Sequence, residues 1–171
     1  MKPLTIISVI WLVLAVFGLA LITVWPAHAQ NAGQIARARG GASCPGCNLF
    51  QADFSNLELK DRNFAGARLR QADLSAAVMN RTSFARGDLR DLNAFGAVLG
   101  GVNFAGANLA NASFVGAYLE GANFRGANLS GANFSGAEMA RAVGLTEAQL
   151  AGACGDADTR LPHGLRLRPC A

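Results

Sequence analysis

Histidine and clustered carboxylates, on which most catalytic sites depend, are scarce in this 171-residue chain. It has two histidines, and only His163, beside Gly164 in the C-terminal tail, lies outside the first 29 residues. The eleven Asp and Glu residues are dispersed, with no histidine or nucleophile at a useful spacing. The recurring glycine turns precede no helix that could cradle a phosphate. We therefore expect no enzyme, no cofactor and no metal site.

An excess of one charge sign is also missing from the middle of the chain. Residues 48–139 carry eight Lys or Arg and eight Asp or Glu. The net charge of +4 comes from Lys2, Arg37 and Arg39 and from the tail, where four arginines from position 141 onward outnumber three acids. This balance is not typical of a nucleic-acid-binding protein, so no nucleic-acid partner is expected.

A five-residue unit repeats nineteen times from Leu49 to Met139 without losing register. Its centre is Leu, Phe or Met in eighteen units, and the residue two positions earlier is Ala in twelve. Asn, Asp or Ser mostly lies between them. A fixed period of this kind is interpreted before local propensity. The centres are Leu49, Phe54, Leu59, Phe64, Leu69, Leu74, Met79, Phe84, Leu89, Ala94, Leu99, Phe104, Leu109, Phe114, Leu119, Phe124, Leu129, Phe134 and Met139.

The period excludes a helix with one buried face, because five helical residues advance by about 500° and successive centres would wander around the axis. In an extended segment, residues two apart share a side. The Ala and the centre then point inward, and the polar residue between them points outward. The next two residues must turn the chain, and Gly fills the second of them in nine units. Short extended sides joined by regular corners are predicted.

These units resemble the pentapeptide-repeat family, whose unit is Ala-(Asp/Asn)-Leu-x-x, over about 95 residues. The resemblance implies an all-β fold, a right-handed quadrilateral β-helix with four units and twenty residues per coil. Nineteen units would make about five coils, a rod roughly 23 Å long at about 4.8 Å per layer. Folding the sequence at twenty residues predicts a column of Phe64, Phe84, Phe104 and Phe124. It predicts a second column of Leu49, Leu69, Leu89, Leu109 and Leu129.

Two positions depart from this pattern. Ala94 replaces a large centre and is followed by Phe95, so we expect the corner to shift and Phe95 or Leu92 to fill the gap. The alternative is that Phe95 stays outside beside Val115, one coil later, as part of a binding patch. Arg62 occupies an inward position in the first coil, and we expect it to escape to the surface, since burying an unpaired arginine is costly.

Charged residues concentrate in the first two coils. Folding at twenty residues places Asp61 under Arg81 and Arg68 under Asp88. We expect these to be solvated ladders that contribute little stability each.

The N-terminal segment predicts export. Residues 4–25 are 22 residues without a charge, preceded by Lys2 and followed by Ala27-His28-Ala29, a small-x-small cleavage signal. The run is also long enough to span a bilayer. Residues 1–29 are therefore either a signal peptide cleaved after Ala29 or a membrane anchor that tethers the chain. Both place the repeats in the periplasm or outside the cell.

Four cysteines agree with export, because an even count in an exported chain favours disulfides. We expect Cys154 to pair with Cys170, and Cys44 with Cys47. A Cys-x-x-Cys redox site would need a βαβ setting that is absent, and covalent haem would need His where Asn48 stands. A four-cysteine zinc site would need both ends of the rod at one place.

Both ends of the repeat have their own sequence character. Thr146-Glu147-Ala148-Gln149 is a capping box that predicts a helix over about 147–153, followed by a loop closed by the second disulfide. This tail would cover an open β-helix end, whose backbone groups are otherwise unpaired. Residues 31–43 look like a flexible linker. The predicted divisions are 1–29, 30–46 (linker and N-terminal cap), 47–141 (β-helix) and 142–171 (C-terminal cap).

One outward column is apolar and forms a possible interaction stripe. Val78, Val98 and Tyr118 precede the centres Met79, Leu99 and Leu119, and Glu58 and Glu138 stand at the ends of the column. Such a stripe either binds a partner or packs across neighbouring strands. Phe95 and Val115 would extend it.

Three functions compete. The first is a non-enzymatic exported scaffold that binds an envelope protein or another copy of itself. The second, which the family resemblance implies, is a DNA-mimicking topoisomerase inhibitor, but that activity goes with acidic cytoplasmic rods. The third is binding of cell-wall glycans, for which only Tyr118, Phe95 and Phe50 offer aromatic platforms.

Overall fold

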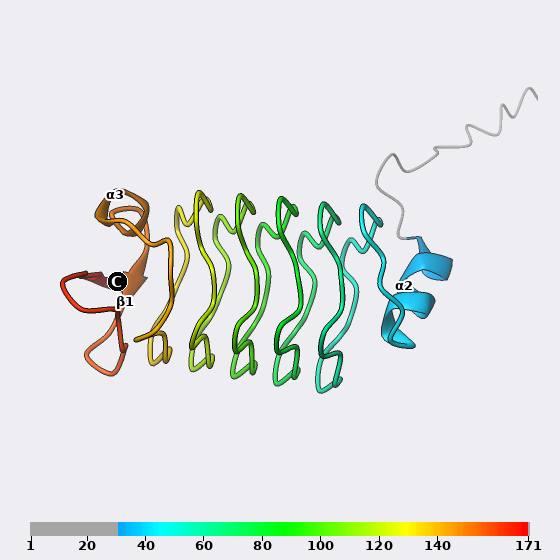
Figure 1. The fold of residues 1–171 in the computed structure, drawn as a ribbon, viewed down its shortest axis with the longest axis horizontal. Coiled ribbons are helices and arrows are strands. Elements are labelled where there is room, and N and C mark those ends of the chain that lie inside the picture. The colour runs from blue at the N-terminus through cyan, green and yellow to red at the C-terminus, as the bar shows by residue number, and fades with distance from the viewer. Residues whose placement is uncertain (1–30, 171) are drawn as a thin grey trace, which may run out of the picture.

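The computed structural model describes residues 31–170, which form a rod of stacked coils with a cap at each end (Figure 1). The helix α2 (Ala32–Arg39) lies at one end. At the other end lie α3 (Glu147–Leu150) and the two short strands β1 (Cys154–Gly155) and β2 (Arg168–Pro169), which pair in parallel. The predicted signal or anchor, residues 1–29, falls outside the described residues. Between 31 and 170 no helix is long and apolar enough to cross a bilayer.

The coils stack in a twenty-residue register. Parallel bridges join each outward residue to the one twenty positions later, as in Asn48–Arg68 and Asn103–Asn123. On each side of a coil a single residue forms the bridge, so residues 48–143 contain isolated bridges and no named strand. Because twenty residues hold four five-residue units, every coil has four sides. We number the sides by their centres: side 1 has Leu49, Leu69, Leu89, Leu109 and Leu129; side 2 has Phe54, Leu74, Ala94, Phe114 and Phe134; side 3 has Leu59, Met79, Leu99, Leu119 and Met139; side 4 has Phe64, Phe84, Phe104 and Phe124.

The core is a set of stacked columns of like side chains. The nineteen centres are all buried, and the five leucines of side 1 are at most 1% exposed. On side 4, Phe64, Phe84, Phe104 and Phe124 stack with ring centroids 5.4–5.7 Å apart. Both predicted columns are confirmed. Equal side chains above one another leave no steps in the wall, which allows close packing in so narrow a core.

The eighteen corners that join the nineteen units use left-handed backbone. Positive φ occurs at the nine predicted glycines, for example at Gly66 (68°), and also at nine other residues. Left-handed backbone favours glycine, so the coil geometry imposes this conformation on residues such as Ala76 (53°). The non-glycine corners are Gln51, Asn56, Asp61, Gln71, Ala76, Arg81, Arg86, Asp91 and Asn111.

The expected shift at Ala94 does not occur. The corner keeps its register, with Gly96 at a φ of 61°, and Phe95 is 58% exposed. Leu92, at the inward position normally held by Ala, is 1% exposed and fills the space that Ala94 leaves. One unit has therefore exchanged its large and small inward residues, which conserves volume without moving the backbone. Arg62 is exposed, as expected.

The segment predicted as a flexible linker is instead a helical cap. Asn31 caps α2 by accepting a hydrogen bond from the Gln34 N–H at 3.0 Å. Ala38 is fully buried against the first coil, and Ile35 packs beside it. Arg39 forms an ion pair with Asp53 at 3.3 Å. The helix therefore covers the N-terminal end of the core.

The C-terminal cap combines a short helix with a disulfide-closed tail. Thr146 caps α3 as predicted, but the helix ends at Leu150 and not near residue 153. The Gln149 side chain donates to the carbonyl oxygens of Phe124 and Ala127, both at 2.9 Å, and so satisfies backbone groups of the last regular coil. The next layer continues through Cys154, which bridges Asn133. Leu150 of α3 is 1% exposed and belongs to the core, so this segment packs against the C-terminal end of the rod (Figure 1).

Candidate functional site

The outward polar residues cap the corners that follow them. In most units the Asn, Asp or Ser oxygen accepts a hydrogen bond from the N–H two residues later. Examples are Asp53 to Ser55 at 2.9 Å and Asn103 to Ala105 at 3.0 Å. These are Asx turns, which satisfy a corner amide that the coil leaves unpaired. The preference for Asn and Asp at this position therefore has a structural cause.

Side 3 departs from this rule along its whole length. Its outward residues are Glu58, Val78, Val98, Tyr118 and Glu138, none of which is Asn, Asp or Ser. Two of its corner amides are capped from the preceding coil instead. Asn80 Oδ1 accepts from the Gly100 N–H at 2.7 Å, and Glu120 Oε1 accepts from the Ala140 N–H at 3.1 Å. The outward positions of these units are thereby released from capping.

The predicted stripe is continuous on side 3. Val78 bridges Val98, and Val98 bridges Tyr118. The two valines are half-buried, and Tyr118 is 37% exposed. A Cβ at Gly100 would lie 3.1 Å from the Tyr118 ring and 3.0 Å from Asn80 Oδ1. Gly100 therefore leaves room for both the ring and the cap.

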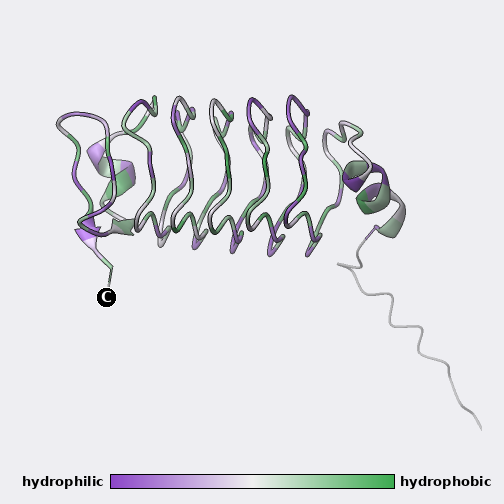
Figure 2. Cartoon of the chain, turned by 90° about the horizontal axis from the view of Figure 1, so that it is seen from below, coloured by the Kyte–Doolittle hydropathy of each residue, from purple (hydrophilic) through white to green (hydrophobic). Residues whose placement is uncertain are grey.

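Phe95 and Val115 lie at the adjoining corner, between sides 2 and 3. Phe95 stands one coil below Val115, because the Gly96 N–H donates to the Val115 carbonyl at 2.9 Å. Each precedes a stripe residue of its own coil by three positions, Phe95 before Val98 and Val115 before Tyr118. We call Val78, Phe95, Val98, Val115 and Tyr118 the apolar surface. The structure thus brings the five predicted residues to one edge of the rod. Along the coils in general, hydrophilic and hydrophobic residues alternate (Figure 2).

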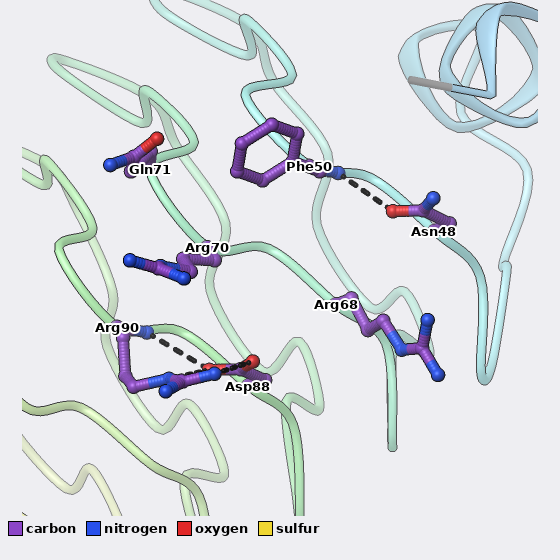
Figure 3. A pocket seen from close by; sticks show the side chains of 7 residues that line it. All are labelled: Asn48, Phe50, Arg68, Arg70, Gln71, Asp88 and Arg90. Carbon is purple, nitrogen blue, oxygen red and sulfur yellow. Dashed lines mark hydrogen bonds and ion pairs between the residues drawn. The ribbon is translucent and has the colours of Figure 1, made fainter. Parts of the chain in front are cut away.

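A second feature, a polar cleft near the N-terminal end, was not predicted. It has a volume of about 570 Å³ and is lined by Asn48, Phe50, Arg68, Arg70, Gln71, Asp88 and Arg90 (Figure 3). The outward residues of side 1 and the first corner residues after them supply all but Gln71. The sequence signal was available, since Phe50, Arg70 and Arg90 recur at intervals of twenty residues.

Two of the three cleft arginines are held by carboxylates. Arg90 donates to both oxygens of Asp88 at 2.7 Å, and this hydrogen bonding lowers the pKa of the Asp88 carboxyl. Arg70 Nε lies 3.3 Å from Asp91. Arg68 bridges Asp88 through the backbone as predicted, but its side chain points away from that carboxylate (Figure 3). In the part of the chain that the structure describes, Arg68 has no ion pair and no side-chain hydrogen bond.

The other predicted charge ladder forms fully. Arg81 donates from Nε and Nη2 to the two oxygens of Asp61, each at 2.7 Å. The pKa of the Asp61 carboxyl is lowered, mainly by this side-chain hydrogen bond. Both groups are well exposed, so the pair adds little stability.

Both predicted disulfides are present. Cys44 joins Cys47 beneath the first coil, and Cys154 joins Cys170 in the C-terminal cap. His163 is exposed in the tail. Between residues 31 and 170, no group of three or more His, Cys, Asp or Glu side chains is arranged to hold a metal ion.

The sequence matches the family model described as Pentapeptide repeats, in eight copies, over residues 63–101, 88–126, 103–143 and 117–154. No curated protein sequence matches the chain. The family assignment rests on this sequence match, because the similar solved structures described below have TM-scores under 0.5.

Three solved structures illustrate the similarity. A pentapeptide repeat protein from the Arabidopsis thaliana thylakoid lumen is 27% identical, with a TM-score of 0.35; the match covers 63% of this chain and 60% of that one. This chain thus spans less than two thirds of that relative. QnrB1, a plasmid-mediated fluoroquinolone resistance protein, is 19% identical over 72% of this chain and 76% of its own, with a TM-score of 0.46. A pentapeptide repeat protein from Nostoc Pcc 7120 is 27% identical over 80% and 88%, with a TM-score of 0.34.

Proposed function

The chain belongs to the pentapeptide repeat family, and from that premise we propose that it is an exported, non-enzymatic scaffold that binds another protein of the cell envelope through its apolar surface. Proteins of this family are generally binding or structural scaffolds. The proposal assigns the binding role to one edge of the rod, where side 3 meets side 2.

The exceptional capping of side 3 is the observation that supports this role. A local Asn or Asp cap is the simplest way to satisfy a corner amide, and the other sides mostly use it. In the units of Val98 and Glu138 the cap comes from another coil. The outward positions between Glu58 and Glu138 carry the partly exposed apolar side chains of Val78, Val98 and Tyr118. Exposed apolar side chains do not stabilise the isolated rod, whereas burying them against a partner would lower the free energy of the complex.

The position of Phe95 strengthens the assignment. Its ring is 58% exposed although a large buried centre is missing immediately before it, at Ala94. Leu92 supplies the missing volume, so the core does not require Phe95. Exposed aromatic residues beside aliphatic ones are typical of the centres of protein interfaces.

Export is supported by two independent features. The uncharged run over residues 4–25 and the Ala27-His28-Ala29 signal are typical of a targeting segment. Both cysteine pairs are close enough to bond, one at each end of the rod, which suits an oxidising compartment. Residues 4–25 would either be removed after Ala29 or tether the scaffold to the membrane.

Site-directed photo-crosslinking in intact cells tests the binding role. A photoreactive amino acid is placed at Val98, on side 3, or at Asn108, the outward position half a coil later on side 1. We expect a discrete adduct from position 98 and none from position 108. Substituting Phe95 and Tyr118 with Ser should abolish the adduct without unfolding the rod. Equal adducts at both positions, or an adduct that survives the substitutions, would overturn the proposal.

Export has its own test. The full chain is fused at its C-terminus to a reporter enzyme that is active only after it leaves the cytoplasm. We expect activity from the intact fusion and none when residues 1–29 are deleted. A fusion that is inactive although produced would contradict the envelope location.

A further inference from the structure

We propose that the cleft on side 1 is a binding site for a phosphate group, carried either by a soluble phosphate ester or by a phospholipid headgroup. The cleft lies in the first three coils, away from the apolar surface on side 3. It is therefore a second site, independent of the protein-binding role.

Charge is the first argument. Three arginines, Arg68, Arg70 and Arg90, line a cleft of about 570 Å³ whose lining contains a single carboxylate, Asp88. The lining thus carries two positive charges in excess, although the repeat region as a whole is neutral. A local excess of this size suits a phosphate group, which carries one to two negative charges and offers two non-bridging acceptor oxygens as a diester or three as a monoester.

The second argument is that the arginines keep unused donors. Arg90 uses Nε and Nη2 on Asp88, and Arg70 uses Nε on Asp91. Within the described residues, Nη1 of Arg90 and both terminal nitrogens of Arg70 are unpaired. The carboxylates hold the two side chains in place, so donors remain available on partly fixed groups. Preorganised donors bind an anion with less loss of side-chain entropy.

Arg68 provides the third argument. The other four outward residues of side 1 each cap the following corner: Asn48, Asp88, Asn108 and Asn128. Arg68 gives up that hydrogen bond and, between residues 31 and 170, makes no other with its side chain. A long cationic side chain at this position has no structural role in the coil. Nothing holds it, so it can turn toward a ligand in the cleft.

Phe50 indicates that the phosphate is esterified. Phe50, Arg70 and Arg90 occupy the same corner position in successive coils, about 4.8 Å apart per layer (Figure 3). The half-buried ring forms an apolar wall next to the guanidinium groups. A bare phosphate would occupy a small part of the cleft. An organic substituent could lie against Phe50 while the arginines hold the phosphate.

Titration of the full-length chain in neutral detergent micelles tests the site. Isothermal calorimetry is run at one fixed, low ionic strength with inorganic phosphate, glycerol 3-phosphate, dihexanoyl phosphatidylglycerol and acetate. We expect saturable binding of the phosphate-bearing probes and at least tenfold weaker binding of acetate. Glycerol 3-phosphate binding as tightly as the lipid supports a soluble ester, and tighter binding of the lipid supports a headgroup.

Two double variants show where the probe binds. Arg68→Gln with Arg70→Gln should weaken phosphate-probe binding at least tenfold. Arg86→Gln with Arg125→Gln removes the same charge from two exposed corner arginines that lie outside the cleft, and should change binding by less than twofold. Circular dichroism verifies that each variant is folded. The proposal is wrong if no phosphate probe binds, if acetate binds equally well, or if both double variants weaken binding alike.

Discussion

Asn80 Oδ1 accepts a hydrogen bond from the backbone N–H of Gly100, one coil later, at 2.7 Å. This contact replaces the local cap that Val98 cannot provide. An apolar residue can therefore occupy position 98 because Asn80, twenty positions before Gly100, caps the Gly100 amide in its place. At this position of side 3 the outward residue and the cap belong to different coils, whereas on the other sides most units contain both the outward residue and the amide that it caps.

Substituting Asn80 with Ala should destabilise the rod by about 1 kcal/mol, because the Gly100 amide loses its acceptor. Val98→Asn in the same chain should recover most of this loss, since an Asn there can cap Gly100 as Asn93 caps Phe95. Urea denaturation of the wild type, both single variants and the double variant measures the coupling. Strictly additive effects would show that the two caps are not alternatives.

The exchange of sizes in the unit around Ala94 gives a second prediction. Leu92→Ala should cost about 2–5 kcal/mol, since a buried side chain is removed and a cavity is left. Adding Ala94→Leu restores the usual small-then-large order and should recover most of the stability. Denaturant midpoints of the single and double variants provide the measurement. A double variant no more stable than Leu92→Ala would mean that the corner at Phe95 cannot accept a large centre.

The repeat made most of the rod predictable. A strict five-residue period fixes which residues point inward, and stacking then follows because equal side chains fill a narrow core best. The columns of Phe64 to Phe124 and Leu49 to Leu129 were predicted on this basis and are observed. The predicted preference for Gly at corners is also observed, and the coil extends the same backbone conformation to residues such as Arg81.

Features that depend on contacts between different parts of the chain were less predictable. Residues 32–39 contain only Ile35 and Ala38 as core contacts, too few to show a helical period, so the sequence predicts a linker where the structure has α2. At Ala94 either Leu92 or Phe95 could supply the missing core volume, and only the packing of the folded coil shows that Leu92 does. In the cleft, the register places Arg68 beside Asp88 correctly, but the carboxylate pairs with Arg90, two residues later in the same unit, which the twenty-residue register does not address.

The two disulfides should contribute unequally. Cys154–Cys170 has a sequence separation of 16 and Cys44–Cys47 one of 3. Loop-closure entropy then predicts losses of about 3 and about 2 kcal/mol when each pair is changed to Ala. Chemical denaturation compares the two variants with the wild type. Limited trypsin digestion adds a local readout, because without Cys154–Cys170 cleavage after Arg166 should precede global unfolding. Equal digestion of both variants would contradict the assigned role of the tail.

Asp88 gives the protein a stability term that depends on pH. The hydrogen bonds from Arg90 lower the pKa of this carboxyl in the folded chain, so the folded state binds the proton less tightly than the unfolded state does. The stabilisation is therefore complete above the ordinary Asp pKa of about 3.9 and is lost as the pH falls through the lower, folded value.

Asp88→Asn removes the charge but keeps the oxygen that caps the Arg90 amide, and Asn is the residue that side 1 uses at positions 108 and 128. Urea midpoints between pH 7 and pH 2 should show the wild type more stable than this variant at neutral pH, with the difference vanishing toward pH 2. The neutral-pH difference should also shrink in 1 M salt, where the Debye length is about 3 Å. A difference that stays constant across the pH range would assign the effect of the substitution to packing and not to the ion pair with Arg90.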